Sequence, residues 1–219
     1  MIKYPRTPHF QFSPEVHSDD KVISLKYLGH FLSTRVIISE KIDGGCTDLS
    51  EDVFARSHST PTDCETFDYI KNVHFHSKRH LFNKDYSYYG ENTYAIHSIK
   101  YEDLDDSFYL FHVLDRVRNV FLSWDDVLKE SKRIGFQVVP IVYDGEVDNM
   151  AFVNKFMDKE IKKESKYGSV REGFVMRVAG EIPFEDFGEY VGKYVRKGHV
   201  QSDKHWKVNW KPQPRFNKS

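Results

Sequence analysis

The sequence of 219 residues contains little cysteine, no long hydrophobic run and almost no net charge. Its two cysteines, Cys46 and Cys64, form no CxxC motif, so neither a disulfide framework nor a cysteine-based zinc site is indicated, and a reducing, cytoplasmic location is favoured. No stretch approaches the roughly 18 apolar residues of a membrane span, and the amino terminus lacks the apolar core of a signal peptide. We therefore expect a soluble protein without a membrane partner.

Neither sign of charge dominates, because 32 lysines and arginines stand against 33 aspartates and glutamates. This balance lacks the positive field of a purely electrostatic nucleic-acid binder, so any contact with a nucleic acid must be local. Aromatic residues make up 15% and charged residues 30% of the chain, which excludes a disordered chain and indicates a β-rich fold. No linker, composition break or internal repeat divides the sequence, and we expect one domain over residues 1–219.

Hydrophobic periodicity predicts an α+β fold, with sheets of several strands and helices outside them. Strands are predicted at 35–41, 47–57, 86–94, 107–114, 137–143, 172–178 and 190–196, the second of them as a strand or hairpin arm. Pro140 places the strand at 137–143 on a sheet edge. Helices are predicted at 65–82, at 149–163 and at 124–135, where Gly135 ends the helix. The first twenty residues are expected to wrap the surface in extended form.

The tetrapeptide at Lys41, Lys-Ile-Asp-Gly, is compatible with covalent chemistry but does not indicate it alone. Lys41 stands at the end of a predicted strand, beside a glycine turn that tolerates unusual backbone angles. An amine in this position can approach a phosphorus atom and form a covalent intermediate once it is deprotonated. Such a pattern also occurs by chance in roughly one chain in twenty, and an exposed lysine before a hairpin turn is the alternative. The residues farther along the chain decide between the two.

Further features follow in order at Arg56, Glu91, the aromatic strand 108–113, Glu172, and Lys193 with Arg196. This order resembles the nucleotidyltransferase motifs of covalent ligases and capping enzymes. It is most similar to the RNA ligase 2 family, and in particular to short, stand-alone RNA ligases with a YPRTPH segment, here at 4–9, and a GHVQxDxHW segment, here at 198–206.

This resemblance implies a nucleotidyltransferase (adenylation) domain of antiparallel sheets flanked by helices, with no OB domain. It also implies an ATP-dependent RNA ligase that joins RNA 5′-phosphate and 3′-hydroxyl ends through an AMP bound covalently to Lys41, with Mg²⁺ or Mn²⁺ as cofactor. The resemblance further identifies a set of expected catalytic residues: Lys41, Asp43, Glu172 and Lys193. It identifies a second, nucleotide-binding set: Glu40, Lys41, Arg56, Glu91, Phe111, Glu172, Lys193 and Arg196.

Phe111 is the residue expected to stack on adenine, with Tyr109 as the second choice, whereas core packing explains most of the other aromatic side chains. Carboxylates near a lysine that attacks a polyphosphate can hold divalent metal ions, so Glu91 and Glu172 are the predicted metal ligands. Glu91 is also a candidate for binding the ribose.

The last motif extends into a basic cluster, in which Lys197 and His199 follow Lys193 and Arg196. The cluster suits contacts with phosphates, and its field would lower the pKa of Lys41, whereas Asp43 and Glu172 would raise it. A solvated surface is the alternative. Only two further basic residues, Lys204 and His205, can add contacts with RNA phosphates, so the protein is expected to hold RNA weakly. A nicked or splinted RNA, whose duplex holds the two ends together, is therefore the expected substrate.

The sequence departs from the family pattern at two places. Gly45 and Cys46 stand where close relatives have glutamate and asparagine, and Val195 stands where a lysine is common. Two rival functions remain: an RNA-end-binding protein that has lost the chemistry, and a DNA ligase or capping-type nucleotidyltransferase. The remaining histidine group comprises His74, His76 and His80, which lack an evident third ligand for zinc and are expected on the surface.

Overall fold

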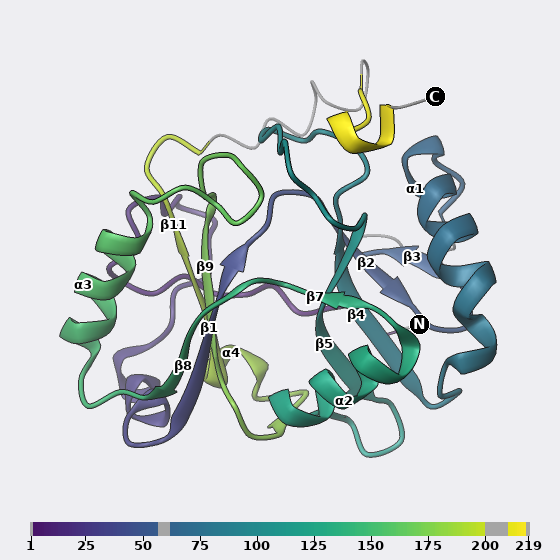
Figure 1. The fold of residues 1–219 in the computed structure, drawn as a ribbon. Coiled ribbons are helices and arrows are strands. Elements are labelled where there is room, and N and C mark those ends of the chain that lie inside the picture. Colours follow the sequence, from purple (N-terminus) through teal and green to yellow (C-terminus); the bar gives the residue numbers. More distant parts are fainter. Residues whose placement is uncertain (1, 57–61, 200–209, 218–219) are drawn as a thin grey trace.

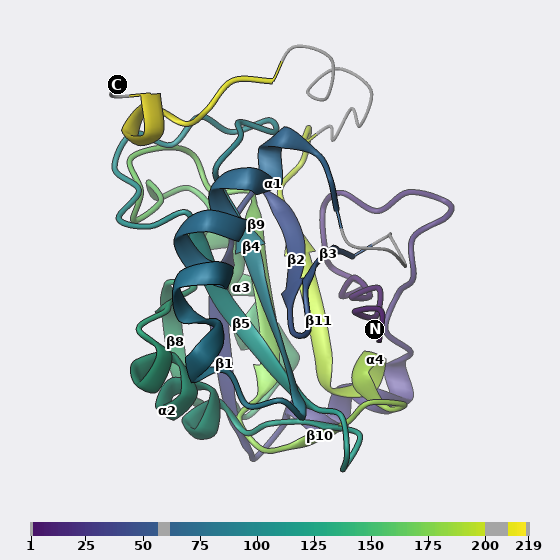
Figure 2. The same cartoon turned by 90° about the vertical axis from the view of Figure 1, so that its right-hand side faces the viewer.

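The computed structural model describes residues 2–56, 62–199 and 210–217. Two β-sheets lie opposite each other, and helices cover their outer sides (Figure 1). In the turned view of Figure 2, the strands run through the middle and the amino-terminal segment follows one flank. This is the predicted α+β arrangement of antiparallel sheets flanked by helices. That one domain accounts for the whole chain, without an OB domain, stays a prediction.

The first sheet contains four antiparallel strands. Their order is β11 (Val191–Val195), β9 (Gly173–Val178), β1 (Arg35–Lys41) and β8 (Ile141–Glu146). The central strand β1 is buried from 36 to 40, which explains its nearly continuous apolar sequence. The predicted strands at 35–41, 172–178 and 190–196 are confirmed.

The second sheet contains seven strands, of which β5 pairs with β7 in parallel and the others pair antiparallel. They are β2 (Gly45–Leu49), β3 (Val53–Ala55), β4 (Tyr86–Asn92), β5 (Phe108–Asp115), β6 (Val120–Phe121), β7 (Gln137–Val138) and β10 (Ile182–Pro183). The predicted strands at 86–94 and 107–114 are confirmed, and the segment 47–57 contains the hairpin of β2 and β3.

The prediction of one strand at 137–143 is wrong, because the chain changes sheets there. β7 belongs to the second sheet, and β8 forms an edge of the first. Between them Pro140 has no N–H to donate, and its carbonyl oxygen accepts the Glu40 N–H at 2.8 Å, where the register of β1 and β8 shifts. The proline thus lies at a sheet edge, as predicted, but it separates two strands.

The helices end where local signals indicate. In α2 (Trp124–Ile134), the Ser123 side chain accepts the Asp126 N–H at the start, and Gly135 adopts a φ of 76° at the end. α3 (Met150–Glu160) buries Val153 and Met157, as its periodicity predicts. The predicted helix at 65–82 is irregular: α1 (Glu65–Ile70) continues as a π-helix (Lys71–His76) and a 3-10 turn (Arg79–Leu81). The remaining short helices are Leu25–Phe31, α4 (Phe187–Tyr190) and Pro214–Asn217.

Two expectations about surface segments hold only in part, because single residues within them are buried. The amino-terminal segment is extended, but Phe10 is fully buried against the first sheet, and Phe10 N–H donates to Lys193 O of β11. His74 is only 1% exposed, and its Nε2 lies 2.9 Å from both Ser107 Oγ and Asp106 Oδ1. Most of residues 2–20 remain at least partly exposed, and His76 and His80 are exposed, as predicted.

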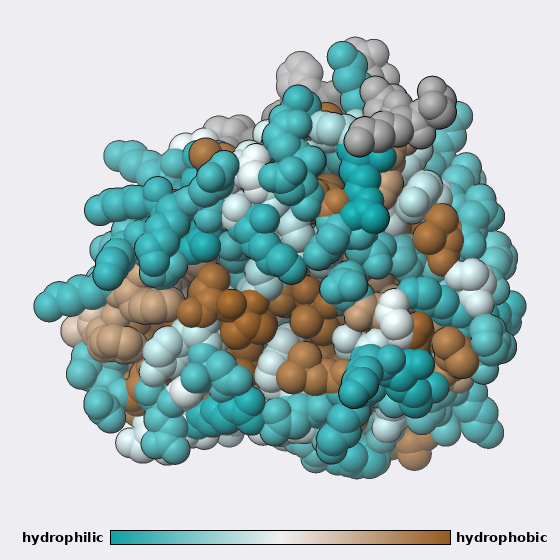
Figure 3. All heavy atoms as spheres, viewed as in Figure 1, coloured by the Kyte–Doolittle hydropathy of each residue, from teal (hydrophilic) through white to brown (hydrophobic). Residues whose placement is uncertain are grey.

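One face of the molecule carries apolar side chains across its middle, with hydrophilic residues around them (Figure 3). Phe152 of α3 is 43% exposed, and its ring packs near those of Tyr143 and Phe156, with centroids 6.0 and 6.1 Å away. The exposed ring belongs to an aromatic contact between α3 and β8.

Within the described ranges, no helix has the length and apolar character needed to cross a membrane.

Candidate active site

A cavity of about 1140 Å³ lies between the two sheets. Its walls come from β1, β2, β4, β5, β9 and β11, and from the amino-terminal segment between Tyr4 and Asp20. Seven of the predicted site residues line it: Glu40, Lys41, Arg56, Glu91, Phe111, Glu172 and Lys193. Residues that are far apart in the sequence therefore meet around one space large enough for a nucleotide.

Lys41 is held in the cavity wall by a single carboxylate. It ends β1 opposite Gly173 of β9, and its Nζ lies 2.5 Å from Glu172 Oε1. Its side chain is 23% exposed. A Cβ at Gly173 would lie 2.1 Å from Tyr194 O, so glycine is needed for β9 and β11 to pack closely beside the lysine. The amine is thus fixed in place and still open to a ligand.

Three buried residues beside Lys41 could hold a metal ion. Ligand atoms of Asp43, Glu172 and His199 lie within 4.8 Å of one another. His199 Nε2 lies 3.2 Å from Glu172 Oε1 and 3.9 Å from Asp43 Oδ1. Glu172 was predicted as a metal ligand, whereas Asp43 and His199 were not, and the oxygens of the other predicted ligand, Glu91, are not part of this group.

The carboxylates dominate the electrostatics of Lys41. Burial lowers the pKa of Lys41, but Glu172, Glu91 and Asp43 outweigh burial and hold it above its ordinary value. Burial raises the pKa of Glu172, yet Lys41 and His199 bring it below the ordinary value. Burial, with Glu172 and Asp43, raises the pKa of Glu91 to about 8. The basic residues therefore lower the pKa of Lys41 less than the acids raise it. Lys41 must lose a proton before it can attack.

Glu91 and Cys46 face each other across β4 and β2, where they are direct register partners. Burial raises the pKa of the Cys46 thiol well above its ordinary value, so the thiol stays neutral beside the acid. Arg56 follows β3 and lines the same wall.

Glycine was expected after Lys41 because the turn would need unusual backbone angles, and this reason is wrong. A Cβ on Gly44 would lie 2.5 Å from Asn92 O, and the chain there has no positive φ. Gly44 is needed for space, not for an unusual backbone angle.

The structure distinguishes the two candidates for the stacking aromatic residue. Phe111 lies on β5 at a register shift with β4, is partly buried and lines the cavity. Tyr109 is fully buried and does not line it, because its hydroxyl donates to Asp105 and its ring packs on Tyr167. Phe111 is therefore placed to present a ring to a ligand, and Tyr109 belongs to the core.

The predicted basic cluster divides along its strand. Lys193 and Val195 of β11 line the cavity, whereas Arg196 does not. Arg196 N–H donates to Glu172 O, and the adjacent strand position turns its side chain to the other face. Lys197 is exposed, and His199 is buried against the acids. Lys204 and His205 lie outside the described residues.

Glu40 lines the cavity but is bound mainly by its neighbours. Its carboxylate accepts the Ser165 hydroxyl at 2.7 Å and the Lys166 N–H at 3.3 Å, and it lies 2.9 Å from Arg171 Nε. These contacts fix β1 to the loop before β9. Glu40 thus supports the wall that carries Lys41.

A profile of the RNA ligase family matches residues 34–195. The chain belongs to the RNA ligase family. The match covers each strand that contributes predicted site residues to the cavity, from Lys41 to Lys193. A comparison with curated proteins gave no match.

Solved structures show the same fold as this member of the RNA ligase family. A Naegleria gruberi RNA ligase mutant with ATP and Mn is 17% identical, with a TM-score of 0.59, and the match covers 89% of this chain and 58% of that one. The Naegleria gruberi RNA ligase with PPi is 18% identical, with a TM-score of 0.59 and coverage of 91% and 60%. A further mutant with AMP and Mn is 15% identical, with a TM-score of 0.56 and coverage of 88% and 61%. This chain thus spans about 60% of the length of these ligases.

The wall contributed by the amino-terminal segment was not predicted as part of the site. Asp20 lies 3.4 Å from His9 Nε2, 3.9 Å from Lys193 Nζ and 3.8 Å from Arg6. Burial, Lys193 and Lys41 outweigh Asp20 and lower the pKa of His9 to about 4, so the imidazole is neutral at pH 7. The signal in the sequence was the YPRTPH segment, which supported the family resemblance but received no role in the site.

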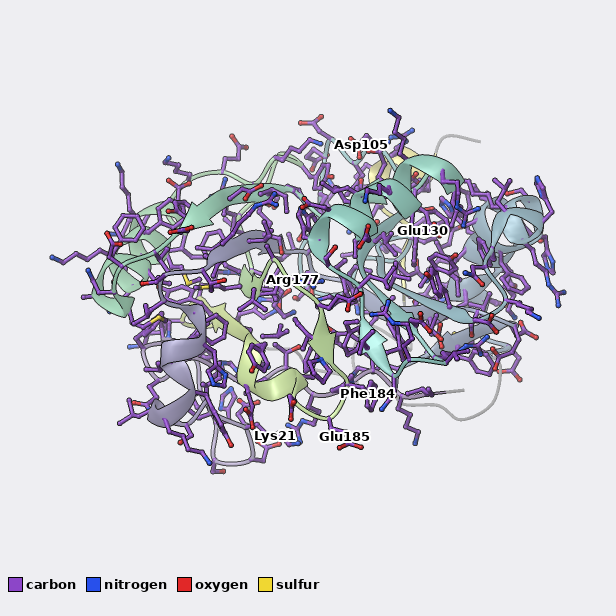
Figure 4. All side chains as sticks on the ribbon, turned by 90° about the horizontal axis from the view of Figure 1, so that it is seen from below. Lys21, Asp105, Glu130, Arg177, Phe184 and Glu185 are labelled. Atoms are coloured by element: carbon purple, nitrogen blue, oxygen red, sulfur yellow. The ribbon has the colours of Figure 1, made fainter. Side chains whose placement is uncertain are left out.

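Arg177 on β9 was missed as well. In Figure 4 it lies between the two sheets. Its Nε and Nη2 donate to backbone carbonyl oxygens of Val178, Leu122 and Gly180, and its Nη1 has no partner within the described part of the chain. Burial lowers its pKa to about 10. An alternating strand predicts a solvated arginine here, and only the packing of the two sheets buries it.

Proposed function

We propose that this protein is an ATP-dependent RNA ligase that carries AMP on Lys41. The observation that supports the proposal is the position of the Lys41 amine. It lies in a nucleotide-sized cavity, 2.5 Å from Glu172, at the end of a strand that is closely packed between its neighbours. A reactive amine needs this combination of a fixed backbone, an open approach and nearby charged groups. The ATP, AMP and PPi in the structures of similar ligases support a nucleotide as the occupant.

The walls of the cavity fit the parts of ATP. Phe111 offers a ring for the adenine, and Glu91 and Arg56 lie on the same sheet and also line the cavity, where they can bind ribose and phosphate. Lys193 approaches from β11 and can contact the α-phosphate, as the family resemblance implies. Arg196 remains a predicted nucleotide ligand, and its direction in this structure makes it the weakest member of the set.

The acids next to Lys41 fit a divalent metal such as Mg²⁺ or Mn²⁺. Asp43 Oδ1 and Glu172 Oε2 are buried without a hydrogen-bond partner in the described ranges, and Glu91 lies close enough to shift the pKa of Lys41. A bound divalent cation would supply charge to offset the polyphosphate and the acids. Asp43 is fixed for such a role, since its other oxygen accepts Ser98 N–H, Ser98 Oγ–H and Ile99 N–H.

In the first step, the neutral Lys41 amine attacks the α-phosphorus of ATP. The N–P bond forms, the bond to the β-phosphate oxygen breaks, pyrophosphate leaves and the nitrogen loses a proton. A 5′-phosphate oxygen of the RNA then attacks this phosphorus, the N–P bond breaks, and the Lys41 nitrogen regains a proton. The RNA 3′-hydroxyl finally loses its proton and attacks the phosphorus of the 5′-phosphate, which forms the phosphodiester and releases AMP. A nick or splint fits this chain, because a duplex holds the two ends together and replaces positioning that the protein would otherwise supply.

Labelled ATP on a denaturing gel tests the proposal. The wild-type chain should give a covalent band, the Lys41→Ala variant should give none, and the exposed control Lys129→Ala should label normally. Lys41→Ala should still join RNA that already carries a 5′-adenylate, because the last step does not use the amine. A Lys41→Ala variant that labels at the normal rate would refute the assignment. Absence of any band in the wild type, with RNA ends still bound, would favour the end-binding alternative.

A further inference from the structure

His199 follows the last strand of the first sheet and turns back into the site. After β11, Gly198 adopts a φ of 75°, and its N–H donates to Glu15 Oε2 at 2.9 Å. A left-handed residue of this kind reverses the chain and favours glycine. The reversal buries the His199 side chain to 3% exposure, against Glu172 and Asp43. A polar ring that could have remained in solvent is therefore placed among acids.

Each of the three residues offers one free buried ligand atom. Asp43 Oδ1, Glu172 Oε2 and His199 Nε2 have no hydrogen-bond partner in the part of the chain that is described. The remaining oxygen of each acid is already used, Asp43 Oδ2 by Ser98 and Ile99 and Glu172 Oε1 by Lys41. His199 Nε2 is close to both acids but is not aligned for a hydrogen bond with either. Buried polar atoms usually have hydrogen-bond partners, so three neighbouring buried atoms without one indicate a site for a bound ligand.

We propose that His199 binds the divalent cation directly, together with Asp43 and Glu172, and that this ligand set favours Mn²⁺ over Mg²⁺. Mg²⁺ prefers oxygen ligands and retains its waters, whereas imidazole nitrogen suits first-row transition metals. Two carboxylate oxygens and one imidazole nitrogen therefore discriminate between the two ions. The inference rests on the proposed function only in assigning a divalent cation to this cavity.

The ion-pair explanation leaves more of the site unexplained. As a cation, His199 would neutralise Glu172 at 3.2 Å, but Lys41 already occupies that carboxylate at 2.5 Å. Asp43 Oδ1, at 3.9 Å, would still lack a hydrogen bond. A metal ion between the three free atoms satisfies all of them at once, since ligand atoms around one ion lie within a few ångströms of each other.

Mn²⁺ binding to the full chain, without nucleotide, provides the test. Electron spin resonance of free Mn²⁺ gives the affinity, and spin-echo modulation from imidazole ¹⁴N reports a nitrogen ligand. We expect His199→Ala to lose the ¹⁴N signal and to lower the affinity for Mn²⁺ by at least about tenfold. Removal of a residue that only supports a metal ligand already lowers metal affinity by about that factor. The affinity for Mg²⁺, measured by competition with Mn²⁺, should fall by a smaller factor. The exposed control His76→Ala should change neither quantity.

Two further variants separate ligation from a structural role. His199→Asp replaces nitrogen with oxygen and should raise the affinity for Mg²⁺ relative to that for Mn²⁺, whereas His199→Gln tests the site if the alanine variant is unstable. A wild type without ¹⁴N modulation, or a folded His199→Ala variant with unchanged Mn²⁺ affinity, would overturn the inference. Lys41→Ala should bind Mn²⁺ and keep the ¹⁴N signal while losing the AMP adduct. A wild type that binds Mn²⁺ through nitrogen but forms no adduct would reject the proposed function alone.

Discussion

Asp48 provides a stability test that does not depend on the chemistry of the site. It lies on β2, is 3% exposed, and does not line the cavity. Burial and the nearby Glu51 raise its pKa from 3.8 to about 7, although Ser50 and Ser87 partly compensate. The native state therefore binds this proton more tightly than the unfolded chain does. Its contribution to stability is complete below pH 3.8 and is lost as the pH rises through 7.

The rise of this pKa from 3.8 to about 7 corresponds to a loss of about 4 kcal/mol in the free energy of unfolding between pH 4 and pH 8. Asp48→Asn removes the titration. Its free energy of unfolding relative to wild type should therefore improve by about 3–4 kcal/mol over this range, and the two proteins should be similar near pH 4.

Urea unfolding at pH 4, 5, 6, 7 and 8 measures this difference, with equal m-values as the check that the same surface unfolds. The exposed Asp148→Asn is the matched control and should stay within about 0.5 kcal/mol of wild type throughout. A difference between Asp48→Asn and wild type that does not change with pH would show that Asp48 is ionised in the native state at low cost, and would refute the reasoning.

Three further predictions concern the proposed reaction. Cys46→Asn places an amide opposite Glu91 and should raise the adenylylation rate about fivefold, which corresponds to one additional hydrogen bond of about 1 kcal/mol. An unchanged or lower rate in a single-turnover assay would contradict this prediction. Phe111→Ala should weaken ATP binding by about 1–3 kcal/mol in calorimetry and Phe111→Tyr should not, whereas Tyr109→Phe should lower stability and leave ATP affinity intact. A nicked RNA duplex should be sealed faster than the same strands without a splint, with a shallow dependence on salt, and faster sealing of the unsplinted strands at all salt concentrations would reject this expectation.

The amino-terminal segment also changes how the cavity should be understood. Asp20 sits among Arg6, His9 and Lys193, at 3.4 to 3.9 Å from their nitrogens. Phe10 anchors this segment in the core and is fully buried. The segment is therefore a fixed wall of the site, and substitutions within it should affect the position of Lys193.

The sequence by itself determined most of the elements and the order of the site residues. Strand 35–41 is predicted by its apolar run, and helix α2 is predicted by its periodicity and by Gly135 at its end, because these signals act within a few residues. The position of Lys41 at a strand end follows from the same local pattern. The family resemblance came from the order of short motifs, which a single sequence records fully.

The sequence analysis already placed Asp43 and Glu172 near Lys41, but only the tertiary structure added His199 and the amino-terminal segment to the site and decided the direction in which the pKa of Lys41 shifts. His199 and Asp43 come from opposite ends of the chain, and the buried Arg177 from a strand whose alternation predicts exposure. Pro140 marks a change of sheet that no local propensity encodes. These outcomes depend on contacts between segments distant in sequence. The pKa of Lys41 likewise depends on the balance of burial against three carboxylates from separate segments. Periodicity reports which face of an element is buried, but it does not report what that face is buried against.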